Sequence, residues 1–322
     1  MTVLNTIIID GLSFALPVFI MAIGGIYSER SGITNLALEG LQGVGAFIGA
    51  LTAYLMVEKA GMDLTTVYYL SFLAAMLGGM LYSLLHALLC IRFKANQVIS
   101  GVVINILATA LTVFLTKAIN RAAFGAASDK IVLSVSPRFT IPGLSAIPVL
   151  GAFFTNLYPF EVMIVVLALI AWFILYKTRL GLHIRACGDN PHAVDAAGIN
   201  VSRTRYFAVM VSGALSGVAG MAFAYSIFSK FSGDVYVGYG YIAIAALIFG
   251  NWNIGRTLFA CLLFGFARSG GYELVKILEL PSVFTDIVMI LPYVLTLVLL
   301  IFMGKNNASP KALGEPYDAS KR

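Results

Sequence analysis

Apolar stretches separated by short polar turns follow one another along almost the whole sequence. A helix needs about 20 apolar residues to cross the roughly 30 Å hydrocarbon core of a membrane. The pattern predicts nine membrane-spanning helices, over residues 4–27, 36–57, 66–91, 96–117, 160–176, 206–228, 236–250, 256–275 and 284–303. The seventh stretch is short for a full crossing, so a half-helix that ends inside the protein is an alternative for it.

The composition supports an all-α polytopic membrane protein with a single transmembrane domain over residues 1–322. Hydrophobic residues make up 60% of the chain and charged residues 11%, against roughly 25% charged residues in soluble domains. The net charge of +6 is spread over short loops and forms no basic stripe, which argues against a nucleic-acid partner. Cys90, Cys187 and Cys261 lie far apart without metal-ligand spacing, so we expect neither a disulfide nor a metal site.

The distribution of Lys and Arg predicts the orientation, because these residues accumulate in cytoplasmic loops. If residues 177–205 lie in the cytoplasm, most basic residues of the short loops lie there too, and the short outer loops hold only three lysines. We therefore expect the N-terminus outside the cell and residues 304–322 as a cytoplasmic tail. The long connection 118–159 then lies outside, either as an ordered cap over the mouth or as a tether.

A polar segment, GDNPHAVDAAGIN at 188–200, interrupts the apolar pattern on the predicted cytoplasmic side. Asn190 suits the N-cap of a helix, Pro191 its first position, and Gly198 the left-handed position after its last turn. A helix this short has only marginal stability in isolation. It therefore either packs on its own protein or docks in a groove of a partner. The candidate docking residues are Arg185, Asp189, Asn190, Pro191, His192, Ala193, Asp195, Ala196 and Gly198.

The sequence shows no energy source of its own for transport, and this favours docking of the short helix on a partner over packing on its own protein. The sequence contains no phosphate-binding G-x-x-x-x-G-K-[ST] loop and no ladder of carboxylates within the spans, which a proton- or sodium-coupled carrier would need. A multi-span protein of this kind fits one that takes its energy from a separate ATPase.

Three segments resemble the signature motifs of one known family. ERSGITNLALEGLQGVGAF at 29–47, TRLGLHIRACGDNPHAVDAAGI at 178–199 and GYGYIAIAALIFGNWNIG at 238–255 resemble, in the expected order, motifs of bacterial ABC-importer permeases of the branched-chain amino-acid/ribose type. Within that family, SERSGITNLALEG at 28–40 and SPKALGEPY at 309–317 are similar to the nucleoside/simple-sugar branch.

The resemblance implies a transmembrane permease subunit rather than an enzyme. It implies that 178–199 contains the coupling helix that docks on a cytoplasmic ATPase, and that the ATPase alone uses ATP, so that this chain binds no cofactor. It also implies a second permease subunit, a longer paralogue, an extracytoplasmic substrate-binding protein, and a location in the bacterial plasma membrane. Nucleosides are the favoured cargo. Simple sugars such as ribose, a secondary carrier and a structural membrane protein are the alternatives.

Polar side chains within the spans are the candidates for contact with the cargo, because such groups are costly in lipid unless they face a cavity. An amide-rich stripe suits a neutral, hydroxyl-rich solute, whereas hydrogen bonding between helices, worth about 0.6 kcal/mol per contact, is the alternative. The candidates are Asn35, Glu39, Asn96, Gln97, Ser100 and Asn105.

Two titratable residues within the spans receive a structural interpretation. We interpret His86 as a hydrogen-bonded core histidine and Arg268 as half of an ion pair, with Glu273 or a carboxylate of another helix as its partner. The pairs Gly45/Gly49 and Gly213/Gly217 predict close helix packing. The first and third motifs both place small residues after a polar turn, which indicates a possible internal repeat.

Overall fold

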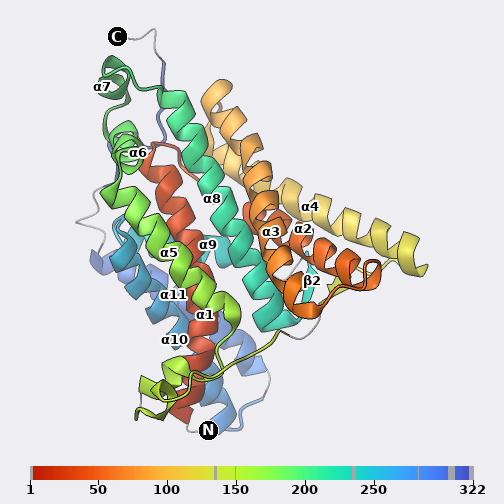
Figure 1. Cartoon of the computed structure of the whole chain (residues 1–322). Coiled ribbons are helices and arrows are strands. Elements are labelled where there is room, and N and C mark those ends of the chain that lie inside the picture. Colours follow the sequence, from red (N-terminus) through yellow and green to blue (C-terminus); the bar gives the residue numbers. More distant parts are fainter. Residues whose placement is uncertain are drawn as a thin grey trace.

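The computed structural model describes residues 3–133, 136–148, 150–233, 237–281, 283–303 and 309–318. These residues form a bundle of long helices (Figure 1). The long helices are α1 (Val3–Arg30), α2 (Leu38–Glu58), α3 (Leu64–Ala87), α4 (Gln97–Phe124), α5 (Pro159–Lys177), α8 (Val201–Phe223), α10 (Ile254–Ile277) and α11 (Val283–Met303). Turns of π-helix, η1 (Leu88–Arg92) and η4 (Ala224–Phe228), extend α3 and α8.

The chain is an integral membrane protein built from helices, as predicted. Seven of its helices are long and apolar enough to cross a membrane, and each of the nine predicted spans coincides with a helix. The ninth span corresponds to α11 and the seventh to α9 (Tyr239–Phe249). The number of full crossings and the orientation stay predictions.

Helix α1 forms the centre of the bundle. In its most apolar window 89% of the residues are buried, against 33% for α4 and for α5, which lie at the periphery. Glycines allow the inner helices to approach closely. A Cβ on Gly45 of α2 would collide with the Cα of Gly217 on α8, and one on Gly79 of α3 with the carbonyl of Gly213. The predicted close packing at these glycines is confirmed.

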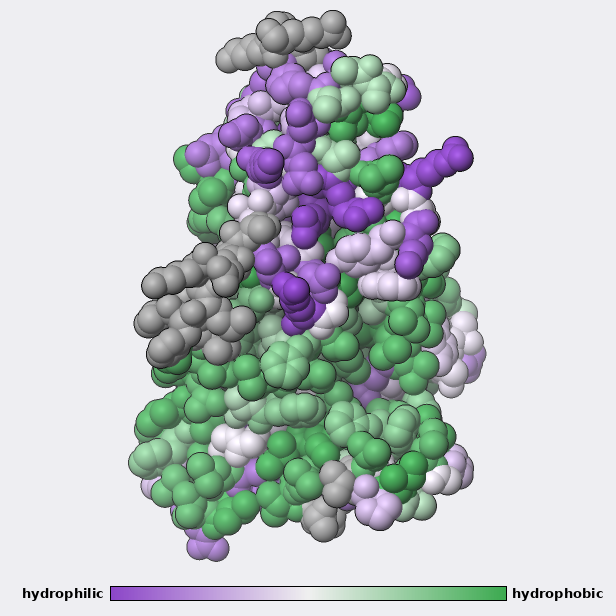
Figure 2. All heavy atoms as spheres, turned by 90° about the vertical axis from the view of Figure 1, so that its left-hand side faces the viewer, coloured by the Kyte–Doolittle hydropathy of each residue, from purple (hydrophilic) through white to green (hydrophobic). Residues whose placement is uncertain are grey.

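The two ends of the bundle differ. Helices α6 (Arg179–Asp189) and α7 (Pro191–Ala196) lie at the end near the last described residues, here called the α7 end, and the N-terminus lies at the opposite end (Figure 1). Polar residues gather toward the α7 end, above a broad apolar surface (Figure 2). Of the predicted tail 304–322, residues 309–318 are described and the rest lies outside the described residues.

The predicted connection 118–159 is shorter than expected, and its described residues contain regular elements. Helix α4 continues to Phe124, because the sequence after Lys117 is rich in alanine, and ends where Gly125 adopts φ 72°. The connection then contributes β1 (Lys130–Val132), which pairs antiparallel with β2 (Lys230–Ser232), and the 3₁₀ turns η2 (Leu144–Ala146) and η3 (Leu150–Phe154). Residues 134, 135 and 149 lie outside the described residues.

Helix α9 has the shortness that the sequence predicts for the seventh span. Its 11 residues rise only about 16 Å, roughly half of a hydrocarbon core. It begins inside the bundle, where Gly238 donates its backbone N–H to the Glu39 carboxylate at the start of α2 (2.7 Å). It ends close to the end of α1, where the indole of Trp252 donates to the Glu29 carboxylate (2.5 Å).

Candidate functional site

The short polar helix has the local structure that its sequence predicts. The side chain of Asn190 accepts a hydrogen bond from Ala193 N (3.0 Å) and caps α7, and Pro191 occupies its first position. Past the last turn, Gly198 adopts φ +78°, a conformation that suits glycine. The α7 helix is therefore fixed at both ends by its own residues.

The preceding helix α6 was not predicted, because its residues are too polar and too few for a membrane span. Its signal is present in the sequence. The hydroxyl of Thr178 accepts from Gly181 N (3.2 Å) as an N-cap, and Gly181, Ile184, Cys187 and Gly188 form a buried face at helical spacing. The predicted coupling segment 177–205 is thus two helices followed by the first turn of α8.

The docking candidates divide into a buried and an exposed set. Pro191 and Val194 are buried, and Val194 packs with Cys187 of α6 and Val201 of α8, whereas Arg185 and Asp195 are partly buried. The Arg185 guanidinium lies 5.7 Å from the ring of Tyr176 and its Nε donates to the Gly181 carbonyl (3.3 Å). The exposed candidates are Asp189, Asn190, His192, Ala193, Ala196 and Gly198.

The path candidates meet at the non-helical residues 31–37 between α1 and α2, here called the clamp loop. Asn35 is fully buried: its Nδ2 donates to the Ser212 hydroxyl on α8 (2.8 Å), and its Oδ1 accepts from Ala37 N (3.0 Å). Asn105 of α4 reaches the same region, where its Oδ1 accepts from Gly40 N (2.7 Å) and its Nδ2 donates to the Leu36 carbonyl (2.8 Å).

The remaining residues of the α4 stripe bind the same loop or cap their own helix. The Gln97 Oε1 accepts from Thr34 N (2.6 Å), and Nε2 of His86 donates to the Thr34 carbonyl (3.1 Å). This tautomer leaves Nδ1 of His86 to accept from the Ser100 hydroxyl (2.9 Å). Asn96 is exposed and caps α4 by accepting from Ile99 N (3.0 Å). The structural interpretation of His86 is confirmed.

Glu39 lies at the start of α9, whereas the side-chain amides of Asn35, Gln97 and Asn105 bind the clamp loop and the start of α2. Its half-buried carboxylate lies at the N-terminus of α9, where it accepts from Gly238 N. A carboxylate is favourable there because the first N–H groups of a helix carry partial positive charge and lack partners within the helix. The start of α9 is therefore held inside the bundle by the carboxylate of an α2 residue.

The interpretation of Arg268 as half of an ion pair is wrong. Its guanidinium stacks over the rings of Phe14 (4.5 Å) and Tyr272 (4.9 Å). Within the described part of the chain no carboxylate oxygen lies within 4.0 Å of it, and Glu273 pairs instead with Lys276 (3.4 Å). Aromatic faces attract a cation through their quadrupole, which the sequence pattern around Arg268 does not reveal.

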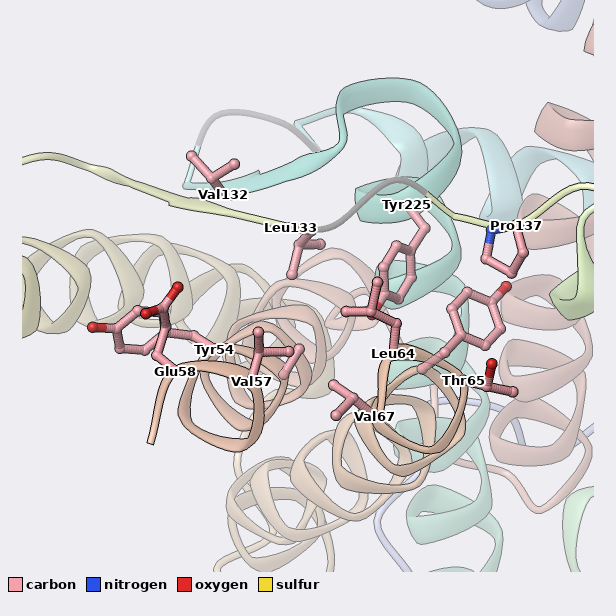
Figure 3. Close-up of a pocket in the computed structure, with 12 residues that line it drawn as sticks. Tyr54, Val57, Glu58, Leu64, Thr65, Val67, Val132, Leu133, Pro137 and Tyr225 are labelled. Atoms are coloured by element: carbon pink, nitrogen blue, oxygen red, sulfur yellow. The ribbon is translucent and has the colours of Figure 1, made fainter. Parts of the chain in front are cut away.

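A cavity of about 310 Å³ lies toward the opposite end, between α2, α3, α8 and β1 (Figure 3). Glu58 and Tyr54 line one side of it, and Tyr225 lines the other. None of the six path candidates lines this cavity. The polar residues that the sequence singled out are therefore grouped around the clamp loop and the start of α9.

Comparison with known proteins identifies a family and several relatives of this chain. The family model for the permease component of branched-chain amino acid transport systems matches residues 7–300. The guanosine ABC transporter permease protein NupQ of Bacillus subtilis is 41% identical over 99% of this chain and 98% of its own length. The nucleoside ABC transporter permease protein NupC of Lactococcus lactis is 38% identical over the full length of both chains.

A more distant relative comes from the same Bacillus. The guanosine ABC transporter permease protein NupP is 26% identical over 93% of this chain and 81% of its own length. No solved structure matches this chain. With the family model covering nearly all of the helical bundle, the chain belongs to the family of permease components of branched-chain amino acid transport systems.

Proposed function

We propose that this chain is a membrane subunit of an ATP-driven importer and that its cargo is a nucleoside. The observation that supports this most strongly is the similarity, over the full length, to permease proteins named for guanosine and for nucleosides. In this function the chain supplies part of a path through the membrane and has no catalytic role. The ATP is used by a partner.

The coupling role of α7 rests on its shape and exposure. The helix buries Pro191 and Val194 against its own subunit and presents His192, Ala193 and Ala196 outward. Small side chains on an exposed ridge allow a groove to close around the backbone, and central buried contacts contribute most of the affinity of an interface. We place the cytoplasmic ATPase on this ridge, with Asp189 at its rim, which puts the α7 end in the cytoplasm.

The importer needs further subunits. NupQ and NupP are two related permease proteins of one bacterium, and this chain covers only 81% of NupP, which is therefore the longer protein. We propose a corresponding pair, in which this chain lies beside a longer paralogue and a binding protein delivers the cargo to the opposite end. A purified importer should then contain one copy of this chain and one of the paralogue, and native mass spectrometry would reveal two copies of this chain if the pairing is wrong.

We assign the cargo route to the region of the polar path candidates. Five of the candidates, Asn35, Glu39, Gln97, Ser100 and Asn105, lie around the clamp loop and the start of α9, and Asn96 caps α4 next to Gln97. Neutral amides and hydroxyls suit a neutral, hydroxyl-rich solute better than a charged one. Since most of these groups already hold hydrogen bonds within the protein, we propose that they flank the route and fix its shape.

Uptake by cells tests the function and its alternatives. Deletion of the gene should abolish the uptake of labelled guanosine and leave ribose uptake unchanged, and the chain carried on a plasmid should restore it. Loss of ribose uptake with unchanged guanosine uptake would indicate that the importer carries simple sugars. Guanosine uptake that follows a proton or sodium gradient and continues without ATP would favour a secondary carrier.

A further inference from the structure

Residues 309–318 fold back onto the α7 end and contact four separate parts of the chain. The backbone N–H of Ala312 donates to the Gly188 carbonyl on α6 (2.8 Å), and that of Gly314 donates to the Gly32 carbonyl on the clamp loop (3.1 Å). At its last described residue, Asp318 pairs with Lys94 between η1 and α4 (3.0 Å). The proposed function assigns no role to this segment.

Arg205 of α8 joins the segment to the clamp loop. It is only 2% exposed. Its Nε donates to the Ser31 carbonyl (3.0 Å) and its Nη1 to the Glu315 carbonyl (3.2 Å). A buried guanidinium is costly unless its donors are satisfied, and here one of the two acceptors belongs to residues 309–318.

Two glycines leave room for the segment. A Cβ on Gly188 would collide with the Arg30 carbonyl and lie 3.2 Å from the Cβ of Pro310. Gly32 adopts φ +94°, and a Cβ there would lie 2.6 Å from Nη2 of Arg205 and 3.2 Å from the Ala312 carbonyl. The path of the segment across α6 and the clamp loop thus depends on residues that lack a side chain.

The segment also completes the packing of α7. Cys187, Val194 and Val201 form a small buried cluster, against which Tyr317 packs. The ring of Tyr317 lies edge-on to that of His192 on α7, with the centroids 5.3 Å apart. Because α7 buries only two of its own side chains, the tyrosine is a substantial part of what holds it in place.

We propose that residues 309–318 are an intramolecular strap that fixes α7 to the clamp loop, with Arg205 as the positioning residue that joins them. A displacement of α7 by a bound ATPase then moves the loop, and the loop is bound in turn to α4 by Gln97 and Asn105. The strap transmits the movement, whereas the exposed ridge of α7 provides the binding. This inference rests on the proposed coupling role of α7.

The test separates transmission from binding. Arg205→Met keeps an unbranched apolar stem and removes the guanidinium with its donors, and Arg256→Met, at an exposed arginine near the start of α10, is the matched control. We expect Arg205→Met to insert and to keep its ATPase bound, while the cargo moved per ATP hydrolysed falls by at least about tenfold, because the variant loses both hydrogen bonds that join the clamp loop to residues 309–318. The control should retain wild-type coupling.

A second variant addresses loss of folding. Tyr317→Ala lies in the strap itself and leaves the bundle intact, so it should lower the same ratio even if Arg205→Met is poorly inserted. Normal coupling in Tyr317→Ala together with normal coupling in Arg205→Met would overturn the strap. Failure of the wild-type chain to bind any ATPase would instead overturn the proposed function.

A covalent cross-link between the strap and the residue before α4 provides the most direct test. Lys94→Cys and Asp318→Cys replace the ion pair, and a short bismaleimide should join them and restore coupling to the Arg205→Met variant. The native cysteines are buried, and burial raises the pKa of the Cys187 thiol, which lowers its reactivity. A cross-linked chain that stays uncoupled would contradict a role of the strap in transmission.

Discussion

Asparagine caps recur where helices begin at the α7 end. Asn96, Asn190, Asn200 and Asn253 each accept a hydrogen bond from the backbone N–H three residues later. A cap depends only on its nearest neighbours in the chain, so the start and end of α7 could be predicted from the sequence. The partners of Asn35 and Asn105 could not be predicted, because Ser212 and Gly40 lie 177 and 65 residues away from them.

The asparagine cap of α7 should contribute more to the stability of its helix than the caps of the longer helices do. Asn190→Ala removes a bond worth about 1 kcal/mol, and a helix of six residues has little else to stabilise it. We expect less ATPase to co-purify with this variant at unchanged membrane abundance. Asn253→Ala makes the same change in the 24-residue α10, which tertiary packing stabilises, and should have little effect. Equal losses in both variants would count against docking through α7.

Gly198 permits a test of backbone conformation without a steric clash. Its φ is +78° and a Cβ would have open space around it, so Gly198→Val acts through strain in the left-handed region, by roughly 1–2 kcal/mol. Gly61, with φ +61° and equally open surroundings between α2 and α3, is the matched control. We expect Gly198→Val to abolish uptake and ATPase binding and Gly61→Val to leave both intact. Normal ATPase binding in Gly198→Val would contradict the docking role.

At the scale of elements, periodicity predicted the long helices well and the polar helices poorly. The apolar runs located all of the long helices, because each buries apolar residues or exposes them to lipid. Helix α6 was missed since charged residues and glycines interrupt its apolar pattern, and the three-residue pairing of β1 with β2 was missed because it joins residues far apart in the sequence. The shortness of α9 was visible in the sequence, but its attachment to Glu39 was not.

The binding of α4 to the clamp loop gives a prediction at this scale. Asn105→Leu leaves Gly40 N and the Leu36 carbonyl without their partner, and each buried unsatisfied group costs about 1–3 kcal/mol. We therefore expect the melting temperature of the purified chain to fall together with uptake. Thr109→Val, which loses only a bond to the Asn105 carbonyl of the same helix (3.2 Å), should change neither strongly. Lost uptake at an unchanged melting temperature would indicate that Asn105 contacts the cargo and does not hold the loop.

For the whole molecule, the arrangement of polar residues agrees with a subunit that is driven from one end. The α7 end gathers α6, α7, residues 309–318 and the clamp loop, and a broad apolar surface lies beyond them (Figure 2). The family and the helical architecture could be predicted from sequence motifs and apolar runs. The strap could not, because its contacts join the last described residues to α6, the clamp loop and α8.

We propose that ATP drives nucleoside import from the α7 end of this subunit. The direct test reconstitutes the purified importer, with its ATPase, second permease and binding protein, into liposomes and measures labelled guanosine movement with ATP on one side only. We predict transport when ATP is on the side that α7 faces, with movement toward that side, and none with ATP on the other side or with a non-hydrolysable analogue. Guanosine movement that is independent of ATP, or that runs away from the α7 side, would contradict the account.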